Sequence, residues 1–305
     1  MFDIENITSL GKQPDFIFLT SCPEDVNTTS AKLTEFLENG AYVQCIVHEA
    51  SKWDPRVDGE SPYAEQINFM IPWVKKGQWE FVTLAPHVQK YVHDKFPTFM
   101  STPDVQYEGR VLHPVLKMAE TDPEVDTKKP FAAIPGKFEP WRRDYDRIFA
   151  NYVKTMPEAD LHLVGSGRPL DIPKTIESHV HYRRNLQFPQ YFAHLSTAIG
   201  IIPAFASPAY TLHQASSSIA TAVICGVPLI ADEAIVKAYT QIPADAMWVQ
   251  GQDESEIDTL ARVSRMGPNV WKEKKKRILQ LRDDMMEQNK AMFVKTLKDI
   301  ELKKK

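Results

Sequence analysis

Cysteine is scarce in this chain of 305 residues, which has only Cys22, Cys45 and Cys225. Their number is odd and no pair has CxxC spacing, which argues against a disulfide framework and against a zinc site. Each cysteine lies in or beside an apolar run. We therefore expect three thiols that act as small buried hydrophobic side chains in a reducing compartment.

Long apolar runs and a dominant charge are also absent. No stretch is long enough to span a bilayer, and the first residues lack the basic and apolar regions of a signal peptide. The formal net charge of -4 gives no general attraction to nucleic acid or to anionic membranes. We interpret the lysine-rich end as a solvated helix. These absences predict a cytoplasmic protein that does not bind nucleic acid and has no membrane span.

The sequence does contain a regular alternation of short apolar runs and amphipathic stretches. This pattern is typical of β-α-β units, which form a mostly parallel sheet with helices on both faces. A polar segment, residues 118–129, is the best linker. The predicted fold class is α/β, with two Rossmann-like domains at 1–120 and 130–305, the second ending in helices. The default ligand site of such a protein is the cleft between its domains.

Cations gather where a predicted strand meets a helix, in the stretch IPGKFEPWRRDYDRIF. Lys137, Arg142 and Arg143 follow Gly136 at the carboxyl end of the strand. The helix start adds unpaired N–H groups and the positive end of its dipole. This combination suits a diphosphate. The alternative is a solvated basic helix start, with Asp144 among its counter-charges.

Three serines open the stretch SSSIATAVICGVPLIAD. Ser216, Ser217 and Ser218 offer hydroxyls and backbone N–H groups at a predicted helix start, and their small side chains leave room for phosphate oxygens. Gly226 is predicted to end the helix, and Pro228 prevents its continuation. We favour phosphate binding, because the stretch lies in the same half as the basic turn. Ordinary N-capping is the alternative.

Two weaker signals accompany these motifs. The run LHLVGSG ends a strand in Gly165 and Ser166, where the backbone can approach a ligand, although the full GxGxxG fingerprint is missing. His48 ends a strand of the first unit and is a candidate to contact a sugar or to act as a base, with a structural role equally open. The remaining histidines considered show no metal spacing, and we interpret them as structural: His113, His162, His179, His181 and His194.

The order of these motifs resembles the GT-B glycosyltransferases, most of all their retaining group-1 (family-4-like) type. GKFEPWRR is similar to the G-R-x4-K motif of that group, with Lys137 at its Arg position and Arg142 at its Lys position. LHLVGSG resembles its L-x-x-x-G-x-G strand, and SSSIATAVICGVPLIAD resembles the loop and helix that hold the donor diphosphate and ribose. VHYRRNLQFPQYFAHLSTAIGIIPAF resembles the stretch that lines the base, and CIVHEA the strand ending in His-Asp. The resemblance covers most of the chain.

The sequence departs from this family in two places. The family's E-x7-E pair falls on His213 and Thr221, and Thr221 replaces only in part a glutamate that holds the ribose. At the front, about fourteen residues precede the first matching strand, where the family has a strand, a Gly-rich loop and a long helix. The resemblance therefore implies a shortened acceptor-side domain. A partner chain or a second copy would complete it, or it would be open to a large substrate.

The resemblance implies a hexosyltransferase whose co-substrate is a nucleotide sugar, most readily a UDP-sugar, with no bound metal and no cofactor. Lys137 and Arg142 would neutralise the departing diphosphate, and His48 would contact the transferred sugar. The donor would be held by Gly136, Arg143, Gly165, Ser166, Ser216, Ser217, Ser218 and Thr221. Two other hypotheses stay open: a non-catalytic binding or scaffold protein that acts with a partner chain, and a phosphosugar isomerase or epimerase with two α/β domains.

Overall fold

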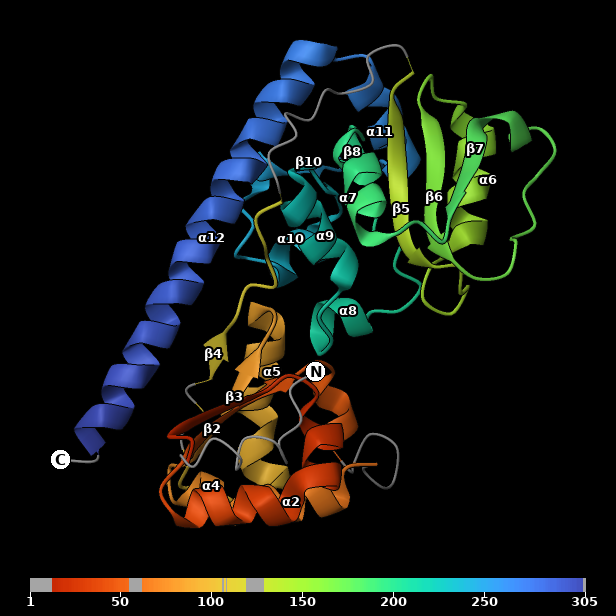
Figure 1. Cartoon of the computed structure of the whole chain (residues 1–305). Coiled ribbons are helices and arrows are strands. Elements are labelled where there is room, and N and C mark those ends of the chain that lie inside the picture. Colours follow the sequence, from red (N-terminus) through yellow and green to blue (C-terminus); the bar gives the residue numbers. More distant parts are fainter. Residues whose placement is uncertain (1–12, 55–61, 106, 108, 119–128, 304–305) are drawn as a thin grey trace. The chain divides into compact units, whose positions relative to one another are not determined.

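The computed structural model describes residues 13–54, 62–105, 107, 109–118 and 129–303 (Figure 1). The chain forms two compact units. Unit 1 comprises Met1–Leu112, Leu212–Ala215 and Gln288–Lys305, and unit 2 comprises His113–Thr211 and Ser216–Glu287. The predicted linker at 118–129 lies almost wholly outside the described residues.

Unit 1 is built on a parallel sheet whose described strands follow the order β1-β2-β3-β4. Each strand is short, β2 and β3 are largely buried, and β1 and β4 are mostly half-buried. Amphipathic helices connect the strands, as the alternation of the sequence predicts. Helix α2 packs against α4, and α5 packs against β3. The elements are β1 (Phe16–Leu19), α2 (Cys22–Glu38), β2 (Tyr42–Val47), the 3-10 turn η2 (Ala50–Trp53), α4 (Ala64–Lys75), β3 (Trp79–Thr83), α5 (Pro86–Phe99) and β4 (Arg110–Val111).

One expectation about unit 1 is wrong. Cys22 and Cys45 form a disulfide, with 5.4 Å between their Cα atoms, and only Cys225 is a free, buried thiol. The topology explains the pairing. Cys45 lies in β2 opposite Leu19 of β1, and Cys22 begins the helix that follows β1 only a few residues later. Spacing along the chain does not reveal a pairing that depends on strand register.

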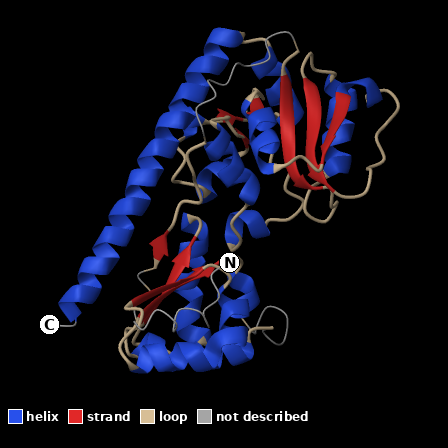
Figure 2. Ribbon diagram, in the orientation of Figure 1, coloured by secondary structure: helices blue, strands red, loops and turns tan. Residues whose placement is uncertain are grey.

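Unit 2 holds a larger parallel sheet, whose strands lie between helices (Figure 2). Its elements are β5 (Phe131–Lys137), α6 (Tyr145–Thr155), β6 (Asp160–Ser166), η3 (Glu177–His179), β7 (Val180–Arg184), α7 (Phe188–Ser196), β8 (Gly200–Ile201), α8 (Ala209–Leu212), α9 (Ser217–Cys225), β9 (Ile230–Ala231), α10 (Glu233–Ala238), η4 (Ala244–Ala246), β10 (Trp248–Val249), α11 (Glu256–Ser264) and the long α12 (Pro268–Lys303).

The strands of unit 2 pair in the order β7-β6-β5-β8, and β9 pairs with β10. A parallel bridge between Ile201 and Leu229 joins the two sets. The combined order β7-β6-β5-β8-β9-β10 is that of a doubly wound Rossmann sheet. Helix α6 packs beside α11 and α7 beside α9, and alternate residues of β5 and β6, such as Ile134 and Leu163, are buried in the apolar core.

The last helix contributes to both units. Its first part belongs to unit 2, whereas residues 288–303 belong to unit 1, as do residues 212–215. In unit 1 the Phe293 ring makes edge contacts with Phe16 and Phe18, with ring centres 6.5 and 5.4 Å apart. The expected second domain, 130–305, included these segments. Among the described residues, no helix combines the length and the apolarity that a bilayer-spanning segment requires.

Candidate functional site at the carboxyl edge of the unit 2 sheet

The strand order of unit 2 reverses between β5 and β8. From β5 the chain builds outward through β6 to β7, and then returns to the other side of β5 with β8. In open parallel sheets, ligands bind beyond the carboxyl ends of the strands at such a reversal, because the connections on the two sides diverge there and leave a crevice. The predicted ligand-binding motifs lie at this edge, since Gly136 and Lys137 end β5 and Gly165 and Ser166 end β6.

The ends of β5 and β6 lie unusually close together. Gly136 pairs with Gly165 and Lys137 with Ser166 in the parallel ladder. A Cβ atom added to Gly165 would fall 1.8 Å from the carbonyl oxygen of Gly136, so no side chain fits there. Gly136 itself has a φ of 119°, which favours glycine. The two glycines thus bring the two backbones close together at this edge.

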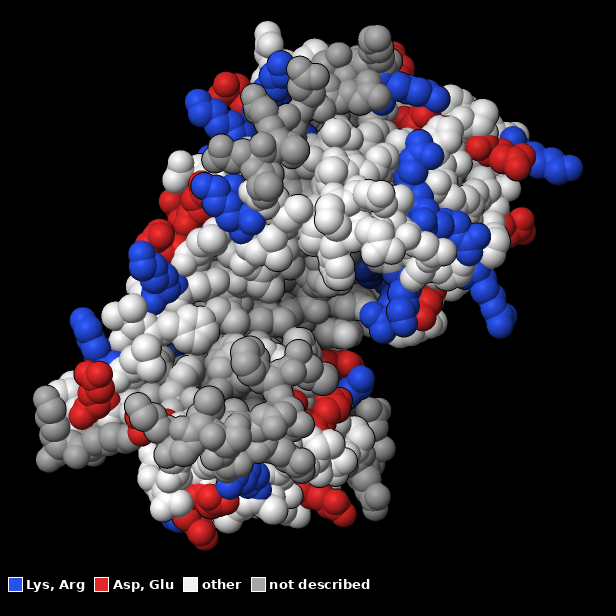
Figure 3. Space-filling view, in the orientation of Figure 1, with Lys and Arg blue, Asp and Glu red and all other residues white. Residues whose placement is uncertain are grey.

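Lysine and arginine side chains gather at this edge, below β5 and β6 in the view of Figure 3. Lys137 is exposed and forms no ion pair within the described part of the chain. Arg142 Nε lies 2.7 Å from Glu139 Oε2, and its guanidinium lies 4.4 Å from the ring centre of Trp141, which is 65% exposed. Lys137 is therefore available to an anion, and Arg142 is held by one half-buried carboxylate and an exposed ring.

Arg143 has a different environment from its two predicted partners. It is 5% exposed, and its Nη2 donates a 2.6 Å hydrogen bond to Ser218 Oγ. Its guanidinium lies 5.7 Å from the ring centres of both Phe205 and Tyr210. Burial lowers the pKa of this guanidinium, although arginine stays charged at any ordinary pH. Arg143 thus connects the loop after β5 to the start of α9.

The predicted helix after the three serines is present as α9, with Gly226 in the left-handed conformation at its end. Ser216 is its N-cap, since its Oγ accepts a hydrogen bond from Ser218 N at 3.3 Å. Ser218 is buried and its hydroxyl is bonded to Arg143. Ser217 is exposed, and neither its hydroxyl nor its amide is bonded within the described residues. N-capping, the alternative interpretation, therefore describes Ser216, whereas Ser217 keeps its donors available.

A tyrosine that sequence reasoning missed holds the start of α9 in place. The Tyr239 hydroxyl accepts a hydrogen bond from Ser216 N at 3.1 Å and donates one to the Tyr210 carbonyl at 2.8 Å. Burial raises the pKa of Tyr239, so this hydroxyl stays protonated. Because Tyr239 follows α10, far along the chain from Ser216, no local motif indicated it.

The positions of the family's two glutamates lie in different units. Thr221, in unit 2, is 8% exposed, and its side chain lies close to that of Tyr191. His213 belongs to unit 1, where its carbonyl accepts a hydrogen bond from Ala50 N at 2.9 Å and its ring meets the edge of Tyr91. Burial lowers the pKa of His213. The resemblance assigns both residues to the donor, and that assignment stays a prediction.

The remaining predicted residue, His48, is also in unit 1. It is exposed, follows directly after β2, and its Nε2 donates a hydrogen bond of 2.8 Å to the Thr20 carbonyl. The structure therefore brings most of the predicted site together within unit 2: Gly136, Lys137, Arg142, Arg143, Gly165, Ser166, Ser216, Ser217, Ser218 and Thr221. The place of His48 relative to them stays a prediction.

No protein-family model matches the chain, and no curated protein matches it in sequence. Solved structures do match. A variant of TarM from S. aureus in complex with UDP matches with a TM-score of 0.63 at 14% identity, over 97% of this chain and 58% of that one. HepE from Anabaena in complex with UDP matches with a TM-score of 0.59 at 13% identity, over 97% and 82% of the two chains. The GtfA/B complex matches with a TM-score of 0.55 at 14% identity, over 97% and 59%.

The fold is that of the GT-B glycosyltransferases. This confirms the α/β fold that the alternation predicts and the GT-B fold that the resemblance implies. At these identities the match concerns the fold alone. The chain spans less than two thirds of the TarM and GtfA/B chains.

Proposed function

We propose that unit 2 binds the diphosphate of a nucleotide sugar and that the protein transfers the sugar to an acceptor. The observation that carries the proposal is the reversal of strand order at β5 and β8. There the paired Gly136 and Gly165, the exposed Lys137 and the exposed Ser217 at the start of α9 lie at one edge of the sheet. Backbone amides, a helix start and cations at one edge are the groups that bind a diphosphate.

The groups at this edge would stabilise the negative charge that develops on the leaving diphosphate. Lys137 and Arg142 supply positive charge, and the Ser217 amide and hydroxyl supply hydrogen-bond donors. These groups perform the task that a divalent cation performs elsewhere, so we propose a transfer without a metal at this edge. Arg143 is a positioning residue, because it holds Ser218 rather than facing the ligand.

UDP is the nucleotide we propose for the donor. HepE and the TarM variant share this fold and bind UDP in their crystal structures, which supports UDP as the first nucleotide to test. Thr221 would contact the ribose, with Tyr191 as its neighbour. His48 would contact the transferred sugar. The acceptor, and a second copy or partner chain on the acceptor side, are further parts of the proposal.

A non-catalytic binding or scaffold role is the second candidate. It is favoured by the side chains of Ser216 and Ser218, which are bonded within unit 2, and by His213 and Thr221 at the positions where the family has glutamates. This candidate predicts that nucleotide binding is absent and that a stable partner takes its place.

Calorimetric titration of the full chain with UDP, GDP, ADP and CMP separates the two candidates. We expect saturable binding of UDP, weakened at least tenfold in Lys137→Ala and in Arg142→Ala, because charge-assisted contacts to phosphate contribute about 1.5–3 kcal/mol each. Sugar transfer should fall in the same variants. The matched control is Lys154→Ala, an exposed lysine in the last turn of α6.

Unchanged UDP binding in both Lys137→Ala and Arg142→Ala would contradict the proposed site. A protein that binds none of the four nucleotides would favour the scaffold role, and the next step would then be a search for the partner chain.

A further inference from the structure

A second polar cluster lies at the opposite edge of the unit 2 sheet, where β6 and β7 begin. The sequence places DLH at 160–162 and HVH at 179–181. In the parallel ladder His162 pairs with His181. Because side chains alternate along a strand, Asp160 and His162 share one face of β6, and His181 lies next to them on β7. Register across strands therefore assembles a cluster that spacing along the chain did not predict.

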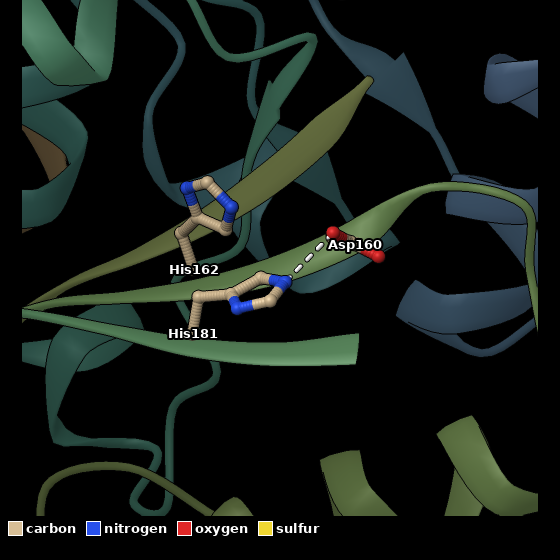
Figure 4. Close-up of side chains that lie close together, drawn as sticks. All are labelled: Asp160, His162 and His181. Atoms are coloured by element: carbon tan, nitrogen blue, oxygen red, sulfur yellow. Dashed lines mark hydrogen bonds and ion pairs between the residues drawn. The ribbon is translucent and has the colours of Figure 1, made fainter. Parts of the chain in front are cut away.

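The three side chains converge closely. His181 Nε2 lies 2.8 Å from Asp160 Oδ2, and the His162 and His181 rings are perpendicular, with centres 5.2 Å apart. One nitrogen or oxygen atom from each of the three residues lies within 4.8 Å of the other two. Figure 4 shows the two rings beside each other, with the carboxylate of Asp160 facing the His181 nitrogen.

Two more histidines lie beside these three residues. His179 Nδ1 lies 3.2 Å from Asp160 Oδ1, and His194 Nε2 lies 3.0 Å from His162 Nδ1. Both rings are half-buried. In metal sites of proteins, the second ring nitrogen of a ligating histidine nearly always forms a hydrogen bond, which fixes the direction of the ring. Ligating carboxylates are hydrogen-bonded in turn. Here His194 contacts the Nδ1 atom of His162, and His179 contacts the carboxylate of Asp160.

We propose that Asp160, His162 and His181 bind a divalent transition-metal ion of the zinc class. Two imidazole nitrogens and one carboxylate oxygen are a ligand set suited to zinc, and a water or a neighbouring imidazole completes four-coordination. In a tetrahedral site with bonds of about 2.0–2.1 Å the donor atoms lie about 3.4 Å apart. Small rotations of the side chains would bring the atoms to that spacing, and the 31% exposed side chain of His181 has room on its solvent side for such a rotation.

The carboxylate of the cluster attracts cations. Asp160 is 1% exposed, and it already attracts the ammonium of Lys129, whose Nζ lies 2.6 Å from Oδ2. The Lys129 side chain is 59% exposed, so it can withdraw into solvent when a metal ion takes its place. A buried carboxylate paired with an exposed lysine is a position where a divalent ion is attracted more strongly than a monovalent one. This competition gives the proposal a specific test.

The proposed metal site is separate from the proposed sugar transfer. His162 and the end of β6 at Ser166 are four residues apart on one strand, about 13 Å at 3.3 Å per residue. A metal at the cluster therefore joins β6 to β7 rather than contacting the ligand at the carboxyl edge. Failure of one proposal leaves the other intact.

The test is calorimetric titration of the chelator-treated full chain with Zn2+, followed by visible absorption of the Co2+ form. We expect one ion per chain. His181→Ala and Asp160→Asn should each weaken binding at least tenfold. Lys129→Gln should tighten binding by up to about fivefold, because it removes a competing cation from Asp160. Zn2+ should also raise the melting temperature of the native chain, and of Lys129→Gln at lower concentrations.

His93→Ala is the control, since His93 is an exposed histidine beside Asp94 in unit 1 and should not change the affinity. Melting in the absence of metal tells whether His181→Ala and Asp160→Asn are folded. Zn2+ binding that survives both substitutions, or no Zn2+ binding by the native chain, would overturn the proposal. Binding that Lys129→Gln leaves unchanged or weakens would overturn the role of Asp160 as a ligand.

Discussion

In unit 1 the described strands cross the sheet in chain order, from β1 to β4, whereas in unit 2 the chain begins in the middle of the sheet and builds outward on both sides. Both sheets are parallel and both are connected by helices. Only the second arrangement contains a reversal, and with it the divergent connections that leave a crevice at the carboxyl edge. The comparison explains why the glycines, serines and cations of the candidate site are concentrated in unit 2.

The two units also differ in the contacts that α12 makes in each of them. In unit 1 the end of α12 adds polar bonds to the sheet: Thr296 Oγ1 accepts from Gln44 Nε2 at 3.2 Å and from Arg110, whose Nε is paired with Glu80 at 2.8 Å. In unit 2 the first part of α12 is held by Lys275, which is buried and hydrogen-bonded to the Ser196 carbonyl. One helix thus contacts a polar sheet surface in one unit and the end of α7 in the other.

The largest expected effect is in unit 2, at Gly165. In Gly165→Ala the new Cβ would meet the Gly136 carbonyl at 1.8 Å, and neither strand can retreat without breaking the ladder. We expect a loss of about 3 kcal/mol or more in the free energy of unfolding, together with loss of nucleotide binding. Chemical denaturation and calorimetry measure the two quantities.

Gly40→Ala in unit 1 is the matched control for that substitution. Gly40 has a φ of 91° but no described atom within 4 Å of an added Cβ, so its cost of about 1–2 kcal/mol comes from backbone conformation alone. Equal losses in the two variants would contradict the close contact between β5 and β6 as the source of the larger effect.

The second expected effect concerns the buried Lys275 of unit 2 and depends on pH. Burial lowers the pKa of Lys275 to about 8. Below pH 8 the lysine is charged in both the folded and the unfolded chain, and the folded chain carries the full cost of burying the charge. As the pH rises from about 8 towards 10.5, the folded chain loses the proton first, so stability increases by up to about 3 kcal/mol, since one pKa unit corresponds to about 1.4 kcal/mol.

Lys275→Met removes this increase, which is measured as the difference between the native chain and the variant across that pH range. Lys276→Met, at an exposed neighbour on the same helix, should keep it. An increase that persists in Lys275→Met would mean that another group causes it.

Much of the fold was predictable because it depends on local patterns. The alternation of apolar runs and amphipathic stretches predicts the order of strands and helices. Gly226 ends α9 as its place before Pro228 indicates. The resemblance added the fold and pointed to the carboxyl edge of unit 2, where the glycines and cations do lie together.

What the sequence did not reveal depends on register and on distant contacts. The Cys22–Cys45 disulfide and the pairing of His162 with His181 both require knowing which residues of neighbouring strands are opposite each other. Tyr239 reaches Ser216 only through the tertiary fold. The end of α12 has an ordinary amphipathic pattern, and nothing local in it indicates that it packs in unit 1.

The smallest expected effect tests the polar contacts between the end of α12 and the sheet of unit 1. In Thr296→Val the shape is kept and the hydroxyl is lost, while Gln44 keeps its 2.7 Å bond to Glu80 and Arg110 keeps its bond to the Met292 carbonyl. We therefore expect a loss of only about 1–2 kcal/mol in the free energy of unfolding. Thr34→Val is the control, because within the described part of the chain the Thr34 hydroxyl bonds only to the Ser30 carbonyl of its own helix. This variant should change stability by less than about 0.5 kcal/mol. If both variants lose the same amount, the hydroxyl of Thr296 contributes through its own helix, and the apolar contacts of Phe293 must then hold the end of α12 in unit 1.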